Sequence, residues 1–153
     1  MRIKTKAILL AVVAASVSAA VYADLQPWKD YTESEPVWSV TTIKVHPNMG
    51  DAYLEGLKST WVQTNEIAKK LGQVEDYHIY RSDLPESGSF NVLLVVKYKN
   101  SEAMAPNKAR FDAFMKELGD ERFKKTTETA QRDYPAMRDI TGEYAMREIT
   151  VNK

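Results

Sequence analysis

The sequence contains no cysteine, and this absence excludes several kinds of chemistry. The chain has no disulfide, no thiol nucleophile and no thiolate ligand for a metal. Histidine is also scarce, with only His46 and His78, and neither belongs to a His-x-His or His-x3-His pair. We therefore expect no metal site and no cofactor.

Glycine-rich motifs are missing as well. The six glycines never cluster, so no loop has the composition that cradles a phosphate group. No Gly-x-Ser-x-Gly sequence is present to form the nucleophile turn of a hydrolase.

The longest uncharged run lies at the N-terminus and has the layout of a signal peptide. Arg2, Lys4 and Lys6 precede the apolar stretch Ala7–Ala20, and Val21-Tyr22-Ala23 offers a cleavage site. We expect residues 1–23 to be a signal peptide cleaved after Ala23, with cleavage after Ala20 as the alternative, and the mature chain to be periplasmic. A transmembrane anchor is the other interpretation, but about 16 uncharged residues fall short of the roughly 20 needed.

Charge provides no reason to expect nucleic acid or an anionic membrane as a partner. The full chain has 21 basic and 21 acidic residues. Cleavage would remove three basic residues and no acidic one, leaving an anionic mature protein. We expect no nucleic-acid binding and no stable membrane anchor after cleavage.

Residue patterns predict an irregular N-terminal arm followed by one domain. Residues 24–36 are polar, contain two prolines and form the expected arm, and residues 37–153 form the domain. The β-branched and apolar runs predict strands over 37–45, 74–81, 90–98 and 143–151. Helical spacing predicts one helix over 52–71, capped by Asn48, and a two-piece helix over 101–140.

This order of elements predicts an α+β fold of ferredoxin-like βαββαβ topology, with a four-stranded antiparallel sheet. The first and third strands of that topology are central, which suits the strong hydrophobicity of 90–98. Its run Phe90–Val96 is apolar on both faces, while the helices cover only one face of the sheet. We expect a second copy to cover the other face, giving a homodimer with two facing sheets and an enclosed space.

The start of the first helix carries a family resemblance. The pattern Val45-x-Pro47 followed by Asp51-x-Tyr53-Leu54-x-x-Leu57 resembles the dimeric α/β-barrel superfamily, with antibiotic-biosynthesis-monooxygenase-like and EthD-like domains. The resemblance implies a dimer with a cavity. It implies no particular reaction, because members include cofactor-free oxygenases, isomerases, haem-dependent enzymes and proteins without known activity.

Five residues are candidates for a functional site. Asp76, His78 and Tyr80 alternate along the second strand and so share a face, where a carboxylate, an imidazole and a phenol would form a proton-transfer set. The alternative is a solvated edge strand. His46 would lie at a cavity mouth or in an exposed turn, and Arg147 would bind an acidic ligand or form an ion pair.

Three functions remain open. The first is an exported dimer that binds a small, partly apolar ligand between its sheets. The second is a cofactor-independent oxygenase or isomerase that uses Asp76, His78 and Tyr80. The third is a protein-interaction module whose N-terminal arm binds a partner.

Overall fold

The structure, a computed structural model, describes residues 25–86 and 88–152. The expected signal peptide, residues 1–23, lies outside the described residues together with its cleavage site after Ala23. Export and periplasmic location therefore stay predictions.

The body of the protein is built on one antiparallel sheet of four strands. These are β2 (Val37–Val45), β3 (Asp76–Arg81), β4 (Val92–Tyr98) and β5 (Arg138–Met146), in the spatial order β3-β4-β2-β5. Numbered along the chain, the order is 2-3-1-4, with helices in both crossovers, which is the ferredoxin-like arrangement. The expected α+β class and the four-stranded antiparallel sheet are confirmed.

The first crossover is one continuous helical segment. It consists of α1 (Gly50–Leu57), the π-helical turn η1 (Lys58–Val62) and α2 (Gln63–Lys70). Gly72 follows with φ of 67°, the left-handed conformation that commonly ends a helix. The prediction of an Asn48 cap was wrong, because the capping position is Met49 and no side chain caps the helix. Asn48 instead takes a positive φ of 63° in the turn before it.

The second crossover contains several shorter helical segments. They are α3 (Ser101–Met104), α4 (Lys108–Leu118), α5 (Asp120–Glu128), the π-helical η2 (Thr129–Asp133) and the 3-10 turn η3 (Tyr134–Ala136). Asn100 and Asn107 cap α3 and α4 through their side-chain oxygens. Within residues 25–86 and 88–152, no helix is both long and apolar enough to cross a membrane.

The end of this crossover differs from the prediction. We expected helix up to residue 140 and strand from 143, but the helical part ends at Ala136 and β5 starts at Arg138. Pro135 disrupts the helical hydrogen bonding, and pairing with β2 then draws the following residues into the sheet. A register shift opposite Thr42 and Ile43 accommodates the extra residue.

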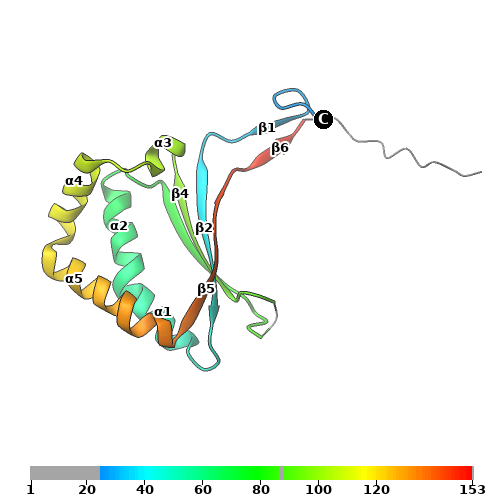
Figure 1. The fold of residues 1–153 in the computed structure, drawn as a ribbon. Coiled ribbons are helices and arrows are strands. Elements are labelled where there is room, and N and C mark those ends of the chain that lie inside the picture. The colour runs from blue at the N-terminus through cyan, green and yellow to red at the C-terminus, as the bar shows by residue number, and fades with distance from the viewer. Residues whose placement is uncertain (1–24, 87, 153) are drawn as a thin grey trace, which may run out of the picture.

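The helices pack against one face of the sheet, and no helix of residues 25–86 and 88–152 lies on the opposite face (Figure 1). The core between the two layers combines sheet residues with helix residues. Its buried members are Ile43, Val45, Tyr53, Leu57, Val92, Leu94 and Tyr134. Near its centre the Tyr134 hydroxyl hydrogen-bonds Thr60 Oγ1, and the Tyr134 ring meets Tyr53 edge-on at 5.2 Å.

Both ends of the described chain meet in a second, two-stranded sheet. Strand β1 (Tyr31–Glu33) pairs antiparallel with β6 (Ile149–Val151). The arm over residues 24–36 was expected to be irregular, and β1 corrects this for its central part. We call residues 25–35 and 148–152 the terminal ribbon. Figure 1 shows that it projects from the body on the side opposite the helices.

Candidate functional site

The face of the sheet that points away from the helices, here called the open face, is made of three cross-strand rows. Because side chains alternate along a strand, these residues point opposite to core residues such as Ile43 and Leu94. From β3 to β5 the rows are Asp76–Lys97–Trp38–Met146, His78–Val95–Val40–Tyr144 and Tyr80–Leu93–Thr42–Gly142.

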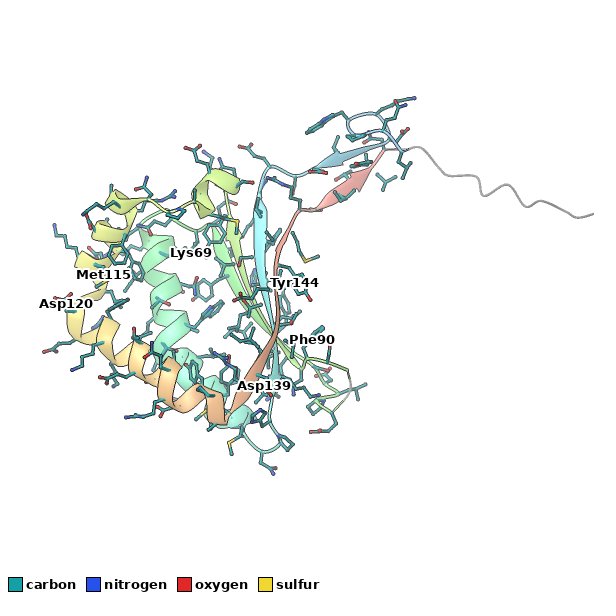
Figure 2. The ribbon with its side chains drawn as sticks, in the orientation of Figure 1. Lys69, Phe90, Met115, Asp120, Asp139 and Tyr144 are labelled. Carbon is teal, nitrogen blue, oxygen red and sulfur yellow. The ribbon has the colours of Figure 1, made fainter. Side chains whose placement is uncertain are left out.

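The open face is apolar over much of its area but uncovered in the single chain. Tyr80 and Tyr144 are each 54 % exposed, and Met146 is similar, while Val95 in the middle is buried by its larger neighbours. Figure 2 shows Tyr144 on the side of the sheet away from Lys69, which lies on α2. An exposed apolar surface of this kind is a candidate contact site.

Asp76, His78 and Tyr80 occupy adjacent rows along β3. Asp76 Oδ2 lies 3.4 Å from His78 Nε2, and the His78 and Tyr80 rings are 5.9 Å apart. The other side of the imidazole is stacked against Trp38 with ring centroids 6.3 Å apart. The sequence missed this role of Trp38, since aromatic residues in a strand more often belong to the core.

The carboxylate of Asp76 is held by two groups besides His78. Its Oδ1 accepts hydrogen bonds from Lys69 Nζ at 2.9 Å and from the Tyr77 backbone N–H at 3.0 Å. The Lys69 ammonium, followed by the Tyr77 N–H, holds the pKa of Asp76 below its ordinary value of 3.8. Asp76 is therefore a fixed anion beside the His78 imidazole.

Neighbouring Tyr77 faces the helices and fixes β3 against α2. Its hydroxyl donates to Glu66, and its ring meets Trp61 edge-on at 5.4 Å. Partial burial and the hydrogen bond to Glu66 raise the pKa of Tyr77 to about 12. The Tyr77 hydroxyl thus has a structural role, whereas the side chains of Tyr80 and Tyr144 lie on the open face.

Tyr80 also borders a hollow on this side of β3 and β4. The hollow has a volume of about 180 Å³ and is lined by Tyr80, Phe90 and Leu93 among others. In a single chain this volume is smaller than that of most ligand sites, which measure about 300–1,000 Å³. A second layer over the open face would be needed to enlarge and close it.

His46 lies in a different place, at the end of β2. Its Nε2 is 2.9 Å from Asp139 Oδ2 and its Nδ1 is 3.2 Å from the Ala136 carbonyl oxygen. Both partners are acceptors, so protonation of both ring nitrogens satisfies both contacts. The hydrogen bond to Asp139, with help from the Ala136 carbonyl, raises the pKa of His46 above 6.5.

His46 also lines a cavity of about 470 Å³ between the end of the sheet, the start of α1 and the β3–β4 loop. This cavity is not the space between two sheets beside which His46 was expected, and binding of a ligand by His46 stays a prediction. Both ring nitrogens of His46 already contact acceptors of the same chain, Asp139 and the Ala136 carbonyl. The ring can therefore contact a ligand in this cavity through its carbon atoms but has no spare N–H to donate. Arg81 also lines this cavity and brings a positive charge to it. Its Nη1 lies 4.0 Å from Asp51 Oδ1.

Asn91 is a cavity residue that sequence reasoning missed. Its Oδ1 accepts from the Val45 N–H at 2.7 Å, and its Nδ2 donates to the carbonyl oxygens of Val45 and Pro85. Asn91 is buried, and it stands between Phe90 and Val92 in the most apolar run of the chain. The sequence did contain a signal for Asn91, namely a polar residue inside an apolar run. Such a residue is expected to be buried, and a buried amide needs hydrogen-bond partners.

Arg147 is positioned at the base of the terminal ribbon. Its Nη1 donates to the carbonyl oxygens of Ser34 at 2.6 Å and Glu35 at 2.8 Å, and its Nη2 donates to Ser101 Oγ. These contacts tie the ribbon to the body. Binding of an acidic ligand by Arg147 stays a prediction.

The described residues contain no group of three or more His, Asp or Glu side chains placed to hold a metal ion. The possible site therefore consists of the open face, with Asp76, His78 and Tyr80 along one edge, and of the separate cavity beside His46. The chemistry available at the open face is proton transfer and apolar contact.

No protein-family model matches the chain, and no curated protein matches it. Among solved structures it is similar to protein SO0527 from Shewanella oneidensis, with 15 % identity and a TM-score of 0.49 over 78 % of this chain and 98 % of that one. HapK from Hahella chejuensis has 17 % identity and a TM-score of 0.45 over 73 % and 91 % of the two chains. PA3566 from Pseudomonas aeruginosa has 13 % identity and a TM-score of 0.42 over 78 % and 97 %. Likeness at this level carries no conclusion about activity, and membership of the dimeric α/β-barrel superfamily stays a prediction.

Proposed function

We propose that the protein is an exported homodimer in which the open faces of two copies enclose a small, partly apolar ligand. The observation that carries this proposal is the open face itself. It presents aromatic and apolar side chains across all four strands, opposite the helices, with its border more than half exposed.

The composition of the open face supports the ligand class. Trp38, Tyr144 and Met146 supply apolar contact area, whereas His78 and Tyr80 add a few polar groups. Small-molecule sites have this composition, a mainly apolar wall with few directional groups. Placed face to face, two such sheets would stand about 10 Å apart and leave room for a flat molecule where side chains are small.

Export is the part of the proposal that rests on sequence alone. The basic start, the apolar run and Val21-Tyr22-Ala23 support cleavage after Ala23 and a periplasmic mature protein.

Native mass spectrometry of the mature protein, purified without denaturation from its own cells, tests this proposal. We expect the mass of two chains plus a small additional mass that is released on denaturation. Val40→Lys places a charge in the middle of the open face and should give the single-chain mass without ligand. A wild-type protein that stays monomeric at tens of micromolar would contradict the proposal.

A second candidate function is a cofactor-independent oxygenase or isomerase. The contact of 3.4 Å between Asp76 and His78, with Tyr80 in the next row, favours it. In the single chain the His78 side chain is 42 % exposed, so the dimer would have to exclude water for efficient proton transfer.

The enzyme hypothesis requires turnover of the ligand identified by mass spectrometry. His78→Gln should then abolish turnover while the dimer and its bound ligand persist. If the ligand is recovered unchanged from wild-type protein incubated in air and also under nitrogen, the protein is a binder and not an enzyme of this type.

A further inference from the structure

The terminal ribbon is well ordered by hydrogen bonds of its own. Besides the β1–β6 ladder, the Ser34 N–H donates to Glu148 O at 2.9 Å, and the Asn152 N–H donates to Asp30 O at 2.9 Å. The Asn152 side chain donates to Lys29 O, and the Gln26 N–H donates to the Asp30 carboxylate. The ribbon is therefore a defined element and not a loose end.

The direction of the ribbon is fixed as well. Arg147 donates from one side chain to Ser34, Glu35 and Ser101, which joins the base of the ribbon to the start of α3. This anchor holds the ribbon on the side of the sheet opposite the helices, where the open face lies (Figure 1).

The apolar side chains of the ribbon have little cover from their own chain. Trp28 is 76 % exposed, Val151 is 70 %, Leu25 is 61 % and Ile149 is 50 %. A two-stranded ribbon alone is only marginally stable in water. Trp28 also has a φ of 69°, a conformation that costs free energy for a residue with a side chain. A strained and exposed tryptophan at the tip of an anchored element has the properties of an interface anchor.

Size explains why the open face needs additional contact area. Four strands about 4.8 Å apart and three rows about 6.7 Å apart make a face of roughly 400 Å². A standard protein interface buries about 800 Å² on each partner. The open face alone is about half of that, and the ribbon carries exposed apolar side chains on the same side of the sheet.

We infer that the terminal ribbon of each chain packs on a second copy of the same chain, with Trp28, Ile149 and Val151 as its main contacts. This inference rests on the proposed homodimer and adds a second contact region to it. In a two-fold symmetric dimer each ribbon contact occurs twice, so the two ribbons together extend the interface well beyond the sheet faces.

The test compares three variants of the mature protein by analytical ultracentrifugation over about a thousandfold range of concentration. The ribbon variant carries Trp28→Ser and Val151→Ser. The matched control carries Phe111→Ser and Phe123→Ser, two exposed apolar residues on the helical side. Val40→Lys reports on the sheet contact alone.

We expect the ribbon variant to raise the dimer dissociation constant at least tenfold, while the control leaves it unchanged. A ribbon variant that dimerises like wild type would overturn the ribbon contact and leave the homodimer standing. Wild-type protein that is monomeric at every concentration would overturn both proposals. Circular dichroism should show the same fold for wild type, ribbon variant and control.

A photo-crosslinking variant tests the contact between the ribbon and a second copy even if the ribbon variant does not fold. Trp28→p-benzoylphenylalanine, prepared as a mixture of light and nitrogen-15-labelled chains, should give cross-links between light and heavy peptides. The chain contains no cysteine, so disulfide exchange cannot produce a false dimer. Cross-links confined to single chains, or to another protein when the reaction is run in periplasmic extract, would overturn the inference.

Discussion

The imidazole of His78 stacks on the indole of Trp38, with ring centroids 6.3 Å apart and an interplanar angle of 29°. The two residues come from different strands and lie on the open face, where Lys97 also places its ammonium 5.6 Å from the Trp38 ring. Trp38 is therefore the centre of a small aromatic and cationic cluster at one end of the open face.

Replacing Trp38 by alanine should lower the free energy of unfolding by about 1–2 kcal/mol, less than the roughly 3–5 kcal/mol of a fully buried aromatic. Urea unfolding measures this change in the free energy of unfolding. Repeating it at two protein concentrations distinguishes a loss of stability within the chain from a loss of dimerisation, because only the latter depends on concentration. The matched control is Phe111→Ala, which removes a ring that is 56 % exposed on α4 and should change stability by less than about 0.5 kcal/mol. Equal losses in both variants would show that Trp38 does not pack as described.

The stability contributed by His46 should depend on pH. Its folded pKa is raised above 6.5, so the contribution is complete below the unfolded pKa and is lost as pH rises through the folded pKa. The stability difference between wild type and Asp139→Asn should therefore shrink from about pH 5 to about pH 9. NMR titration of the His46 ring protons should give a midpoint above 6.5 in wild type and a lower one in Asp139→Asn. Identical midpoints would contradict the Asp139 contact.

Close packing of Tyr134 against Gly56 predicts a strong effect of one methyl group. A Cβ on Gly56 would stand 2.9 Å from Tyr134 Cε1, whereas a Cβ on Gly50 would meet nothing within 4 Å. Gly50 is the first residue of α1 and Gly56 lies inside the helix, where alanine has the higher helix propensity, so propensity alone would favour Gly56→Ala. We expect Gly56→Ala to be less stable than Gly50→Ala by about 1–3 kcal/mol in thermal or urea unfolding. Equal stability would mean that Tyr134 can move aside without cost.

Arg147 should control the order of the terminal ribbon. Removing its side chain in Arg147→Ala leaves the carbonyl groups of Ser34 and Glu35 without their charged donor. Hydrogen exchange should become at least about tenfold faster for the amides of Glu148 and Asn152, while amides of β2 and β4 stay protected. Arg147→Lys keeps the charge but loses the forked geometry and should be intermediate. Unchanged exchange in Arg147→Ala would show that the ladder alone orders the ribbon.

Local patterns in the sequence determined much of the architecture. The β-branched run Val37–Val45 matches β2 at both ends, and the helical spacing over 52–71 matches a segment that ends before Gly72. The strong hydrophobicity around Val92–Tyr98 identified a central strand. These features depend on propensity and periodicity within a few residues, which is the information that a single sequence carries.

The tertiary structure alone decided the pairing of distant segments. Strand β1 exists because β6, more than a hundred residues later, supplies its hydrogen-bonding partner, and β5 begins at Arg138 because β2 draws it into the sheet. In the same way Asp139 reaches His46 and Trp38 reaches His78 only after folding. No local pattern records such contacts, because their free energy depends on which surfaces the packed layers bring together.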